Sequence, residues 1–147
     1  MIAVIQRCSQ GKVTVSDKVV GEISHGLVIL LGVQKNDTEN DAEFLVNKIC
    51  GLRIFNDEND KMNLSIKDVN GSALVISQFT LCGDTKKGRR PSFVNAALPE
   101  DGNRLYEYFM LEMKKGGVPI ECGEFGAMMD VELVNNGPVT FVMNSKD

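Results

Sequence analysis

The 147-residue chain has few of the side chains on which hydrolytic enzymes usually depend: it contains one histidine, no tryptophan and four cysteines. A Ser-His-Asp or Cys-His catalytic site would need His25 as its base. The segment Ser24-His25-Gly26 is predicted to be a turn between two strands, where a histidine is usually structural, so such a site is disfavoured. No group of His, Cys, Asp or Glu has metal-ligand spacing, and neither a phosphate-binding loop nor a dinucleotide fingerprint is present. We therefore expect no metal and no cofactor, and an enzyme with this composition would rely on backbone groups, hydroxyls and its substrate.

Long hydrophobic runs are also missing. No apolar segment is long enough to span a bilayer, and the opening Met1–Arg7 is typical of a first strand rather than of a signal sequence. The cysteines are far apart and form no CxxC pair, which is typical of reduced thiols; they are Cys8, Cys50, Cys82 and Cys122. These features predict a cytoplasmic protein with no membrane partner.

Positive charge is scarce overall but concentrated in one place. The net charge of −4 argues against non-specific binding to a nucleic-acid duplex. Four of the sixteen Lys and Arg residues nevertheless lie within five positions, at Lys86, Lys87, Arg89 and Arg90. Such a loop can hold a phosphate chain locally, although a solvated charged loop is the commoner case. The acidic segment Asn56–Lys61 lacks the spacing of a calcium loop and is predicted to be a hairpin loop.

Hydrophobic periodicity predicts one globular domain, residues 1–147, of the α+β class, with sheet-rich, barrel-like packing of mainly antiparallel strands and two main amphipathic helices. The first helix is expected to run from a cap at Asp37 or Thr38 to Gly51, and the second from Asp101 to Lys115. Strands are expected at residues 2–8, 13–15, 18–23, 26–33, 53–55, 73–81, 118–122 and 127–134, with a final strand after Pro138.

The strand expected over residues 73–81 changes abruptly from apolar residues to Ser77-Gln78-Phe79-Thr80. In a strand, Ser77 and Phe79 would share one face and Gln78 and Thr80 the other. Backbone N–H groups in this segment can hold an oxyanion or a carbonyl, and Thr80 offers a hydroxyl. From this segment alone, however, hydroxyl residues that simply end a strand are the favoured interpretation.

A second unusual segment is Asn135-Asn136-Gly137-Pro138, which lies between two β-branched and apolar runs and predicts strand, tight turn, strand. Gly137 tolerates backbone angles closed to other residues, and Pro138 fixes φ and lacks an N–H donor. The pair therefore presents backbone carbonyls in a rigid geometry, or it is an ordinary hairpin turn. Because only about 5–6% of X–Pro bonds are cis, the sequence by itself favours a trans bond here.

Taken together, four segments resemble the D-aminoacyl-tRNA deacylases: Ser77–Leu81, Asp84–Phe93, Phe125–Met129 and Asn136–Thr140, with Val4–Arg7 similar as well. The resemblance covers essentially the full chain, with the motifs in the right order. It implies a homodimeric proofreading enzyme of translation, with active sites at the subunit interface. Its reaction would be hydrolysis of the ester between a D-amino acid and the terminal adenosine of tRNA.

The resemblance also implies roles for the two motifs. Ser77, Gln78, Phe79 and Thr80 match the family motif that lines the pocket for the aminoacyl-adenosine. Gly137-Pro138 matches a pair with a cis peptide bond that is inserted into the partner subunit's active site. Its carbonyls would accept from the substrate amino group and leave no room for an L side chain. A backbone wall of this kind predicts broad tolerance of D-amino acids and no exclusion of glycine.

Three further residues are assigned by the same resemblance. Arg7 stands at the position of an arginine that supports the Gly-Pro loop, and Phe125 and Met129 resemble residues that pack on the terminal adenine. The basic loop is expected to contact phosphates of the tRNA acceptor end. Asn136 departs from the family pattern, in which an acidic residue is frequent just before Gly-Pro.

The lack of a histidine base fits substrate-assisted hydrolysis, in which the neighbouring ribose hydroxyl helps and the N–H groups of Phe79 and Thr80 polarise the ester carbonyl. A covalent role for Thr80 is the second choice, because an unactivated hydroxyl needs an adjacent base. Two other classes remain open: a small tRNA-independent hydrolase and a non-catalytic RNA-binding module. Against the latter, aromatic residues make up only 6% of the chain, and the sequence reveals no exposed stacking platform.

Overall fold

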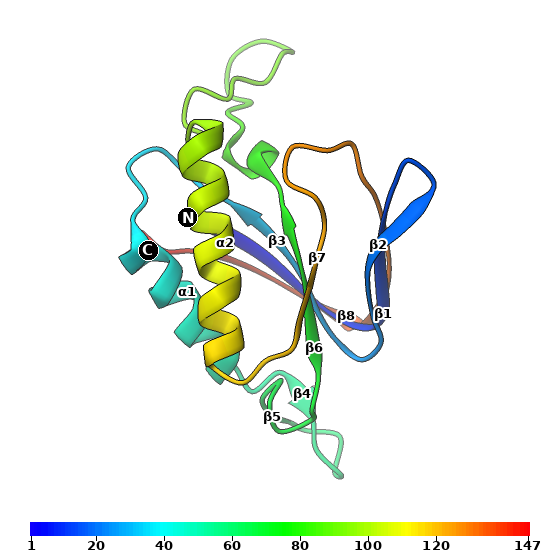
Figure 1. The fold of residues 1–147 in the computed structure, drawn as a ribbon. Helices are drawn as coiled ribbons and strands as arrows, with labels where there is room; N and C mark the ends of the chain where they lie inside the picture. The colour runs from blue at the N-terminus through cyan, green and yellow to red at the C-terminus, as the bar shows by residue number, and fades with distance from the viewer.

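One six-stranded sheet forms the centre of the structure, and two helices lie side by side against one of its faces (Figure 1). The computed structural model describes residues 1–147. In chain order its elements are β1 (Ile2–Val15), β2 (Lys18–Ile23), β3 (Gly26–Gly32), α1 (Glu39–Gly51), β4 (Phe55–Asn56), β5 (Met62–Leu64), β6 (Ser72–Ser77), the 3-10 helix η1 (Phe79–Cys82), α2 (Pro99–Lys115), β7 (Ile120–Cys122) and β8 (Asp130–Asn144).

The sheet is mixed. β1 pairs antiparallel with β2, β3 and β8, whereas β3 with β6 and β6 with β7 form parallel pairs. Parallel neighbours need a crossover connection, and the chain supplies α1 between β3 and β6 and α2 between β6 and β7. The predicted class, a sheet-rich α+β fold with two main helices, is confirmed; the two parallel pairs were not predicted.

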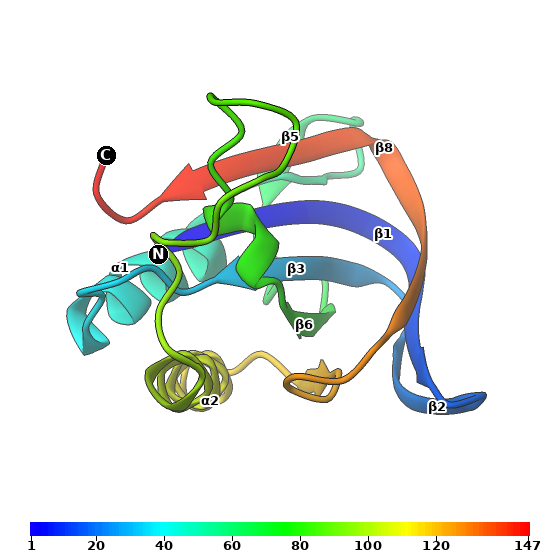
Figure 2. The same cartoon turned by 90° about the horizontal axis from the view of Figure 1, so that it is seen from above.

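The sheet curls until β2 and β7, at the two ends of the strand order, meet. Gly21 of β2 lies so close to the carbonyl oxygen of Cys122 in β7 that a Cβ would not fit. The Glu22 N–H also donates to the Glu121 carboxylate at 3.4 Å. Figure 2 shows β1 and β8 bending together toward β2. This near-closure is the barrel-like packing that the sequence predicted.

Alternation along the central strands buries both faces of the sheet. Leu27 and Ile29 of β3 belong to a cluster of 21 buried residues between the sheet and the helices, together with Leu45 and Phe109. Val28, which points the other way, belongs to a smaller cluster of six inside the curl. At about 25 cal/mol per Å² of apolar area, these two clusters are the main source of stability.

Both predicted helices are present. Thr38 caps α1 in a capping box, in which the Thr38 N–H donates to Asp41 Oδ2 at 2.8 Å. α2 begins at Pro99, earlier than the predicted Asp101, because proline is well suited to the first helical turn, where no N–H is needed. No helix is long and apolar enough to cross a membrane.

Several strand boundaries differ from the prediction. The strands expected at 2–8 and 13–15 are one continuous strand, β1, and the strand expected from residue 127 begins at Asp130. The strand expected at 53–55 is Phe55–Asn56, and the loop that follows it does join a hairpin, β4 and β5.

The strand predicted over residues 73–81 is too long, since β6 ends at Ser77 and Phe79–Cys82 form η1. The predicted alternation of Ser77 to Thr80 on two strand faces is therefore wrong. The Gln78 N–H donates to the Leu31 carbonyl at 2.7 Å, and the turn closes through the Leu81 N–H to the Gln78 carbonyl at 3.1 Å. Tertiary contacts here override residues of high strand propensity.

The predicted strand, tight turn, strand around Gly137-Pro138 is wrong in its pairing. Both flanks belong to β8, and both pair with β1 rather than with each other. Gln6 pairs with Thr140 and Cys8 with Asn135, so residues 136–139 bulge out opposite Arg7. A bulge re-aims a short segment while the ladder continues on either side. The Gly-Pro pair is thus held by β1 at both ends.

Candidate active site

The end of β6 forms one edge of an apolar cavity of about 580 Å³. Ser77, Gln78 and Phe79 line it, together with Phe125 and Met129 from the segment that follows β7. The remaining lining residues come from β6, from β8, from the segment that leads into α2 and from the segment after β7: Ile76, Phe93, Ala96, Ala97, Leu98, Pro99, Gly126, Ala127 and Val131. Five of the residues predicted from the sequence are therefore brought together around one cavity.

The geometry of η1 determines what this edge can donate. Phe79 and Thr80 open the turn, and the first N–H groups of a helical turn have no acceptor within it. Thr80 is exposed, and its Oγ1 accepts a hydrogen bond from Gln78 Nε2 at 2.5 Å. The side chain hydrogen-bonded to the Thr80 hydroxyl is thus an amide donor, which cannot act as a base.

The opposite wall is built on α2. The Phe125 ring lies 6.0 Å from the Tyr106 ring, and a Cβ on Gly102 would be only 3.5 Å from Phe125 Cζ. Burial raises the pKa of Tyr106 far above its ordinary value, and its hydroxyl donates to the Val75 carbonyl at 2.9 Å. Tyr106 is therefore a fixed neutral support for Phe125.

The Gly-Pro bulge lies apart from this cavity within one chain, because neither Gly137 nor Pro138 lines it. The Gly137-Pro138 peptide bond is cis, as the resemblance implied and contrary to the sequence-only expectation, and both residues are exposed. A Cβ on Gly137 would collide with the Val139 nitrogen. Only glycine fits this conformation.

Arg7 fills the gap that the bulge leaves beside β1. It is 7% exposed, and its Nε donates to the Asn136 carbonyl at 2.7 Å while Nη2 lies 3.4 Å from Asn136 Oδ1. Nη1 donates to the Ile54 carbonyl at 2.8 Å and to Asn56 Oδ1 at 3.2 Å. The guanidinium thus connects the bulge to the β4–β5 hairpin, and the Asn136 amide supplies a side-chain oxygen to this contact.

Asn135 holds the other side of the bulge. Its Nδ2 donates to the carbonyl of Arg7 at 2.8 Å and to the carbonyl of Val139 at 3.0 Å. One amide therefore joins the two ends of the bulge to β1. Sequence reasoning did not single out Asn135, because its role depends on a pairing between distant strands.

The basic loop projects from the end of the molecule that carries η1 (Figure 1). Backbone hydrogen bonds between Asp84 and Ser92, at 2.7 and 2.9 Å, close its base. Its four cationic side chains are exposed and form no ion pair within the chain: Lys86, Lys87, Arg89 and Arg90. They are free to meet an anionic partner.

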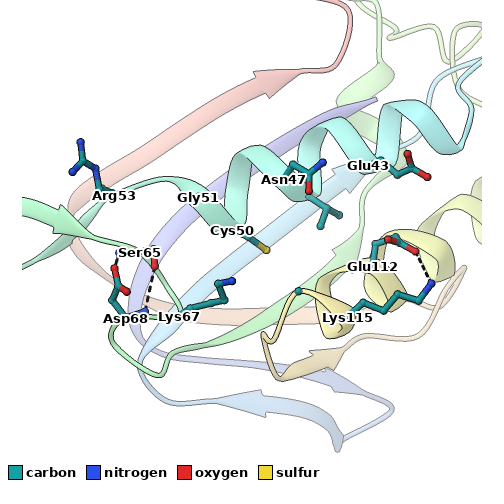
Figure 3. Close-up of a pocket in the computed structure, with 12 residues that line it drawn as sticks. Glu43, Asn47, Cys50, Gly51, Arg53, Ser65, Lys67, Asp68, Glu112 and Lys115 are labelled. Atoms are coloured by element: carbon teal, nitrogen blue, oxygen red, sulfur yellow. Dashed lines mark hydrogen bonds and ion pairs between the residues drawn. The ribbon is translucent and has the colours of Figure 1, made fainter.

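A second cavity, of about 670 Å³, lies between the C-terminal ends of α1 and α2 and the turn after β5 (Figure 3). It contains none of the predicted site residues, and one ion pair, Lys115 with Glu112, lies in its lining. Lys115 Nζ lies 3.0 Å from Glu112 Oε1, and the Asp68 carboxylate accepts the Ser65 N–H at 2.8 Å. Burial raises the pKa of the Cys50 thiol that lines it, which disfavours a thiolate nucleophile there.

His25 lies outside both cavities. Its ring packs edge-on against Phe55 at 5.3 Å, in a small hollow behind the Gly-Pro bulge that Arg7 and Asn136 also line. It does not line the cavity formed by Ser77–Phe79, which agrees with the structural role expected for a turn histidine.

Known proteins share both sequence and fold with this chain. Residues 4–144 match the family described as D-Tyr-tRNA(Tyr) deacylase. A D-aminoacyl-tRNA deacylase of Bacillus cytotoxicus is 55% identical over 146 residues, covering 99% of this chain and 100% of the relative. One of Clostridioides difficile is 54% identical over 145 residues, covering 99% and 97%. A solved structure named c-Myc DNA Unwinding Element Binding Protein superposes with a TM-score of 0.91 at 36% identity, covering 98% of each chain.

The chain has a curled α+β sheet and an apolar cavity, and it matches these relatives along its length. Together these findings place it in the class of aminoacyl-tRNA deacylases. The chain belongs to the D-Tyr-tRNA(Tyr) deacylase family. The enzyme class predicted from its motifs is confirmed at the level of the family.

Proposed function

We propose that this protein hydrolyses the ester bond of D-aminoacyl-tRNA and releases the free D-amino acid and tRNA, as a cytoplasmic proofreading enzyme. The observation that carries the proposal is the apolar cavity that Ser77, Gln78 and Phe79 line together with Phe125 and Met129, at the start of η1. The aromatic and thioether side chains hold the terminal adenosine. The N–H groups of Phe79 and Thr80 receive the ester carbonyl oxygen as negative charge develops on it.

Water attacks the ester carbon, the bond between that carbon and the ribose oxygen breaks, and the ribose oxygen takes up a proton. No side chain of this cavity is a general base, since its lining residues contain no His, Asp, Glu or Lys. The neighbouring ribose hydroxyl of the substrate is therefore the group that assists the proton transfer. Thr80 acts as a positioning residue rather than as a nucleophile, because its hydroxyl accepts a hydrogen bond from the Gln78 amide and has no base beside it.

Two substrates and one variant separate these roles. A tRNA ending in 2′-deoxyadenosine, charged at its 3′ hydroxyl, should be hydrolysed at least about 100-fold more slowly, a typical size for a lost acid–base contribution. Thr80→Ala should retain substantial activity on the ordinary substrate. If Thr80→Ala abolished the activity while the wild-type protein hydrolysed the deoxy substrate without loss of rate, the covalent route would be established instead.

The bulge at Gly137-Pro138 acts in a neighbouring copy of the chain. It is exposed and absent from its own chain's cavity, and β8 pairs only with β1, so its other edge is free for a second copy. Val134, Phe141 and Val142 on β8 are exposed to 48%, 39% and 73%, which is apolar area suited to such an interface. Inserted into the partner's cavity, the carbonyls of this backbone wall accept from the substrate amino group and exclude an L side chain.

The direct experiment compares hydrolysis of D-tyrosyl-, L-tyrosyl- and glycyl-tRNA by the wild-type protein. Turnover of the D ester and the glycyl ester, with the L ester spared, is expected because the wall meets only an L side chain. Equal hydrolysis of both enantiomers would rule out the proposed chirality filter. Activity on a simple D-amino-acid ester in the absence of tRNA would identify a tRNA-independent hydrolase.

The DNA-binding name of one solved relative favours a second candidate, a nucleic-acid binding module without catalysis. It predicts tight binding of tRNA and no release of amino acid under any condition, which the same assay detects.

The basic loop is proposed to contact phosphates of the acceptor end, because its four cations have no partner within the chain. The double variant Lys87→Glu, Arg89→Glu should weaken tRNA binding. It should also reduce the slope of log K against log salt by the amount that about two lost phosphate contacts contribute. The matched control is Lys18→Glu with Lys61→Glu, two exposed lysines in hairpin regions distant in the chain. An unchanged affinity and salt slope would leave the loop without a role in tRNA binding.

A further inference from the structure

Two exposed phenylalanines form the rim of the candidate active-site cavity. Phe79 of η1 and Phe93 both line the cavity, and their ring centroids are 5.0 Å apart at an interplanar angle of 67°. Phe79 is 56% exposed and Phe93 is 38% exposed. Leu98, which is 69% exposed, lines the same cavity, and Val94, which follows Phe93 in the chain, is 61% exposed. A contiguous exposed apolar patch at the mouth of a cavity indicates a contact surface rather than core packing.

This rim lies between the cavity and the basic loop. The backbone pair of Asp84 and Ser92 closes the loop, and Phe93 is the next residue in the chain. Gly83, just before the loop, lets the Phe93 ring come close, since a Cβ there would lie 3.1 Å from Phe93 Cε1. The aromatic pair therefore adjoins both the base of the cationic loop and the cavity.

This arrangement suits a single strand of nucleic acid entering the cavity with its last nucleotide. Such strands are held by cations along the backbone and by aromatic rings on which unpaired bases stack. With the terminal adenosine inside the cavity, the preceding base leaves at the rim and its phosphates approach the loop. The angle between the rings lets one ring face the base while the other meets the edge of the base.

We infer that Phe93, with Phe79, stacks the nucleobase that precedes the terminal adenosine. This inference rests on the proposed deacylase function and adds a second nucleotide subsite to it. It also replaces the sequence-based expectation that the chain has no exposed stacking platform, because the two rings are far apart in the sequence and meet only in the fold. The charge of the adjoining loop favours an anionic strand over a second copy of this acidic chain as the occupant.

The test compares substrates that differ only in the nucleotides beyond the terminal one. Phe93→Ala should lower kcat/KM about 10-fold or more for D-aminoacyl-tRNA and for a D-aminoacyl trinucleotide ending in adenosine. It should leave kcat/KM unchanged for D-aminoacyl-adenosine, which has no base to stack. Phe93→Tyr should restore kcat/KM for the two longer substrates. Phe44→Ala, which removes an exposed phenylalanine of α1, should leave kcat/KM for both of them unchanged.

An equal loss on all three substrates would overturn the inference, because Phe93 would then only support Phe79. No loss on any of them would overturn it as well, and so would a fall in the oligomer mass of Phe93→Ala, which would mean that a second copy covers the rim. A wild-type protein without activity on D-aminoacyl-tRNA would instead refute the proposed function, which separates that failure from a failure of the rim alone.

Discussion

At the scale of single residues, the site depends more on amides and backbone groups than on titratable side chains. Asn135 joins both ends of the Gly-Pro bulge to β1 with one Nδ2 group, and Arg7 holds the bulge through the Asn136 carbonyl. These contacts hold both sides of the Gly137-Pro138 pair, whose carbonyls form the proposed wall. The proposed chirality filter requires such a fixed wall, since a shift of the wall would admit the wrong enantiomer.

Asn135→Ala should therefore weaken selectivity as well as stability. Two hydrogen bonds at about 0.5–1.5 kcal/mol each predict a loss of about 1–3 kcal/mol in the free energy of unfolding. The ratio of D- to L-aminoacyl-tRNA hydrolysis should fall with it, and rates on both enantiomers measure that ratio.

Asn40→Ala, which removes an exposed amide of α1 outside the bulge, is the matched control and should keep the ratio. A variant at position 135 that is less stable but equally selective would show that Asn135 has a purely structural role.

At the scale of elements, the sequence was informative wherever local pattern determines structure. The helix ending at Gly51 and its cap at Thr38 follow from periodicity and capping chemistry, and β3 follows from its apolar run. The bulge could not be predicted, because a strand, turn, strand pattern does not say whether its flanks pair with each other or with a third strand. The turn at Phe79 was missed for a related reason, since strand propensity gives way there to the contact of Gln78 with Leu31.

The start of α1 carries a pH-sensitive contact. Burial opposes ionisation of Asp41, but hydrogen bonds from Lys146, from the Thr38 N–H and from Ser145 outweigh it and hold the pKa of Asp41 well below its usual range. Because the folded pKa lies below the unfolded value of about 4, this contribution is fully present above pH 4 and is lost as the pH falls further.

Asp41→Asn should accordingly destabilise the protein by about 1–2 kcal/mol at pH 7, and by less at pH 3. Urea unfolding at the two pH values measures the difference. Asp130→Asn, at an exposed aspartate that starts β8, is the control and should change stability little at either pH. An equal loss at both pH values for Asp41→Asn would mean that its charge is not the stabilising feature.

At the scale of the whole molecule, one chain carries both the cavity and the exposed bulge of the proposed shared site but does not bring them together. The cavity lined by Ser77–Phe79 and the exposed Gly137-Pro138 bulge belong to different regions of the surface. Resemblance, rather than any pattern in the sequence, predicted the assembly of two copies, because no apolar stripe in the sequence identifies the interface. The free edge of β8 and its exposed apolar side chains are the structural features that fit it.

The proposed shared site predicts how mixed dimers behave. Gly137→Ala disrupts the bulge, and Ala127→Trp fills the cavity, so each variant alone should be inactive on D-aminoacyl-tRNA. A mixed dimer contains one intact cavity opposite one intact bulge.

The measurement that tests this account most directly is the deacylation rate of that mixed dimer, purified with a different tag on each chain. The account predicts that activity returns to about half the wild-type rate per dimer, because one of two sites is complete. A mixed dimer as inactive as its parents, or a wild-type protein that is active as a monomer, would contradict it.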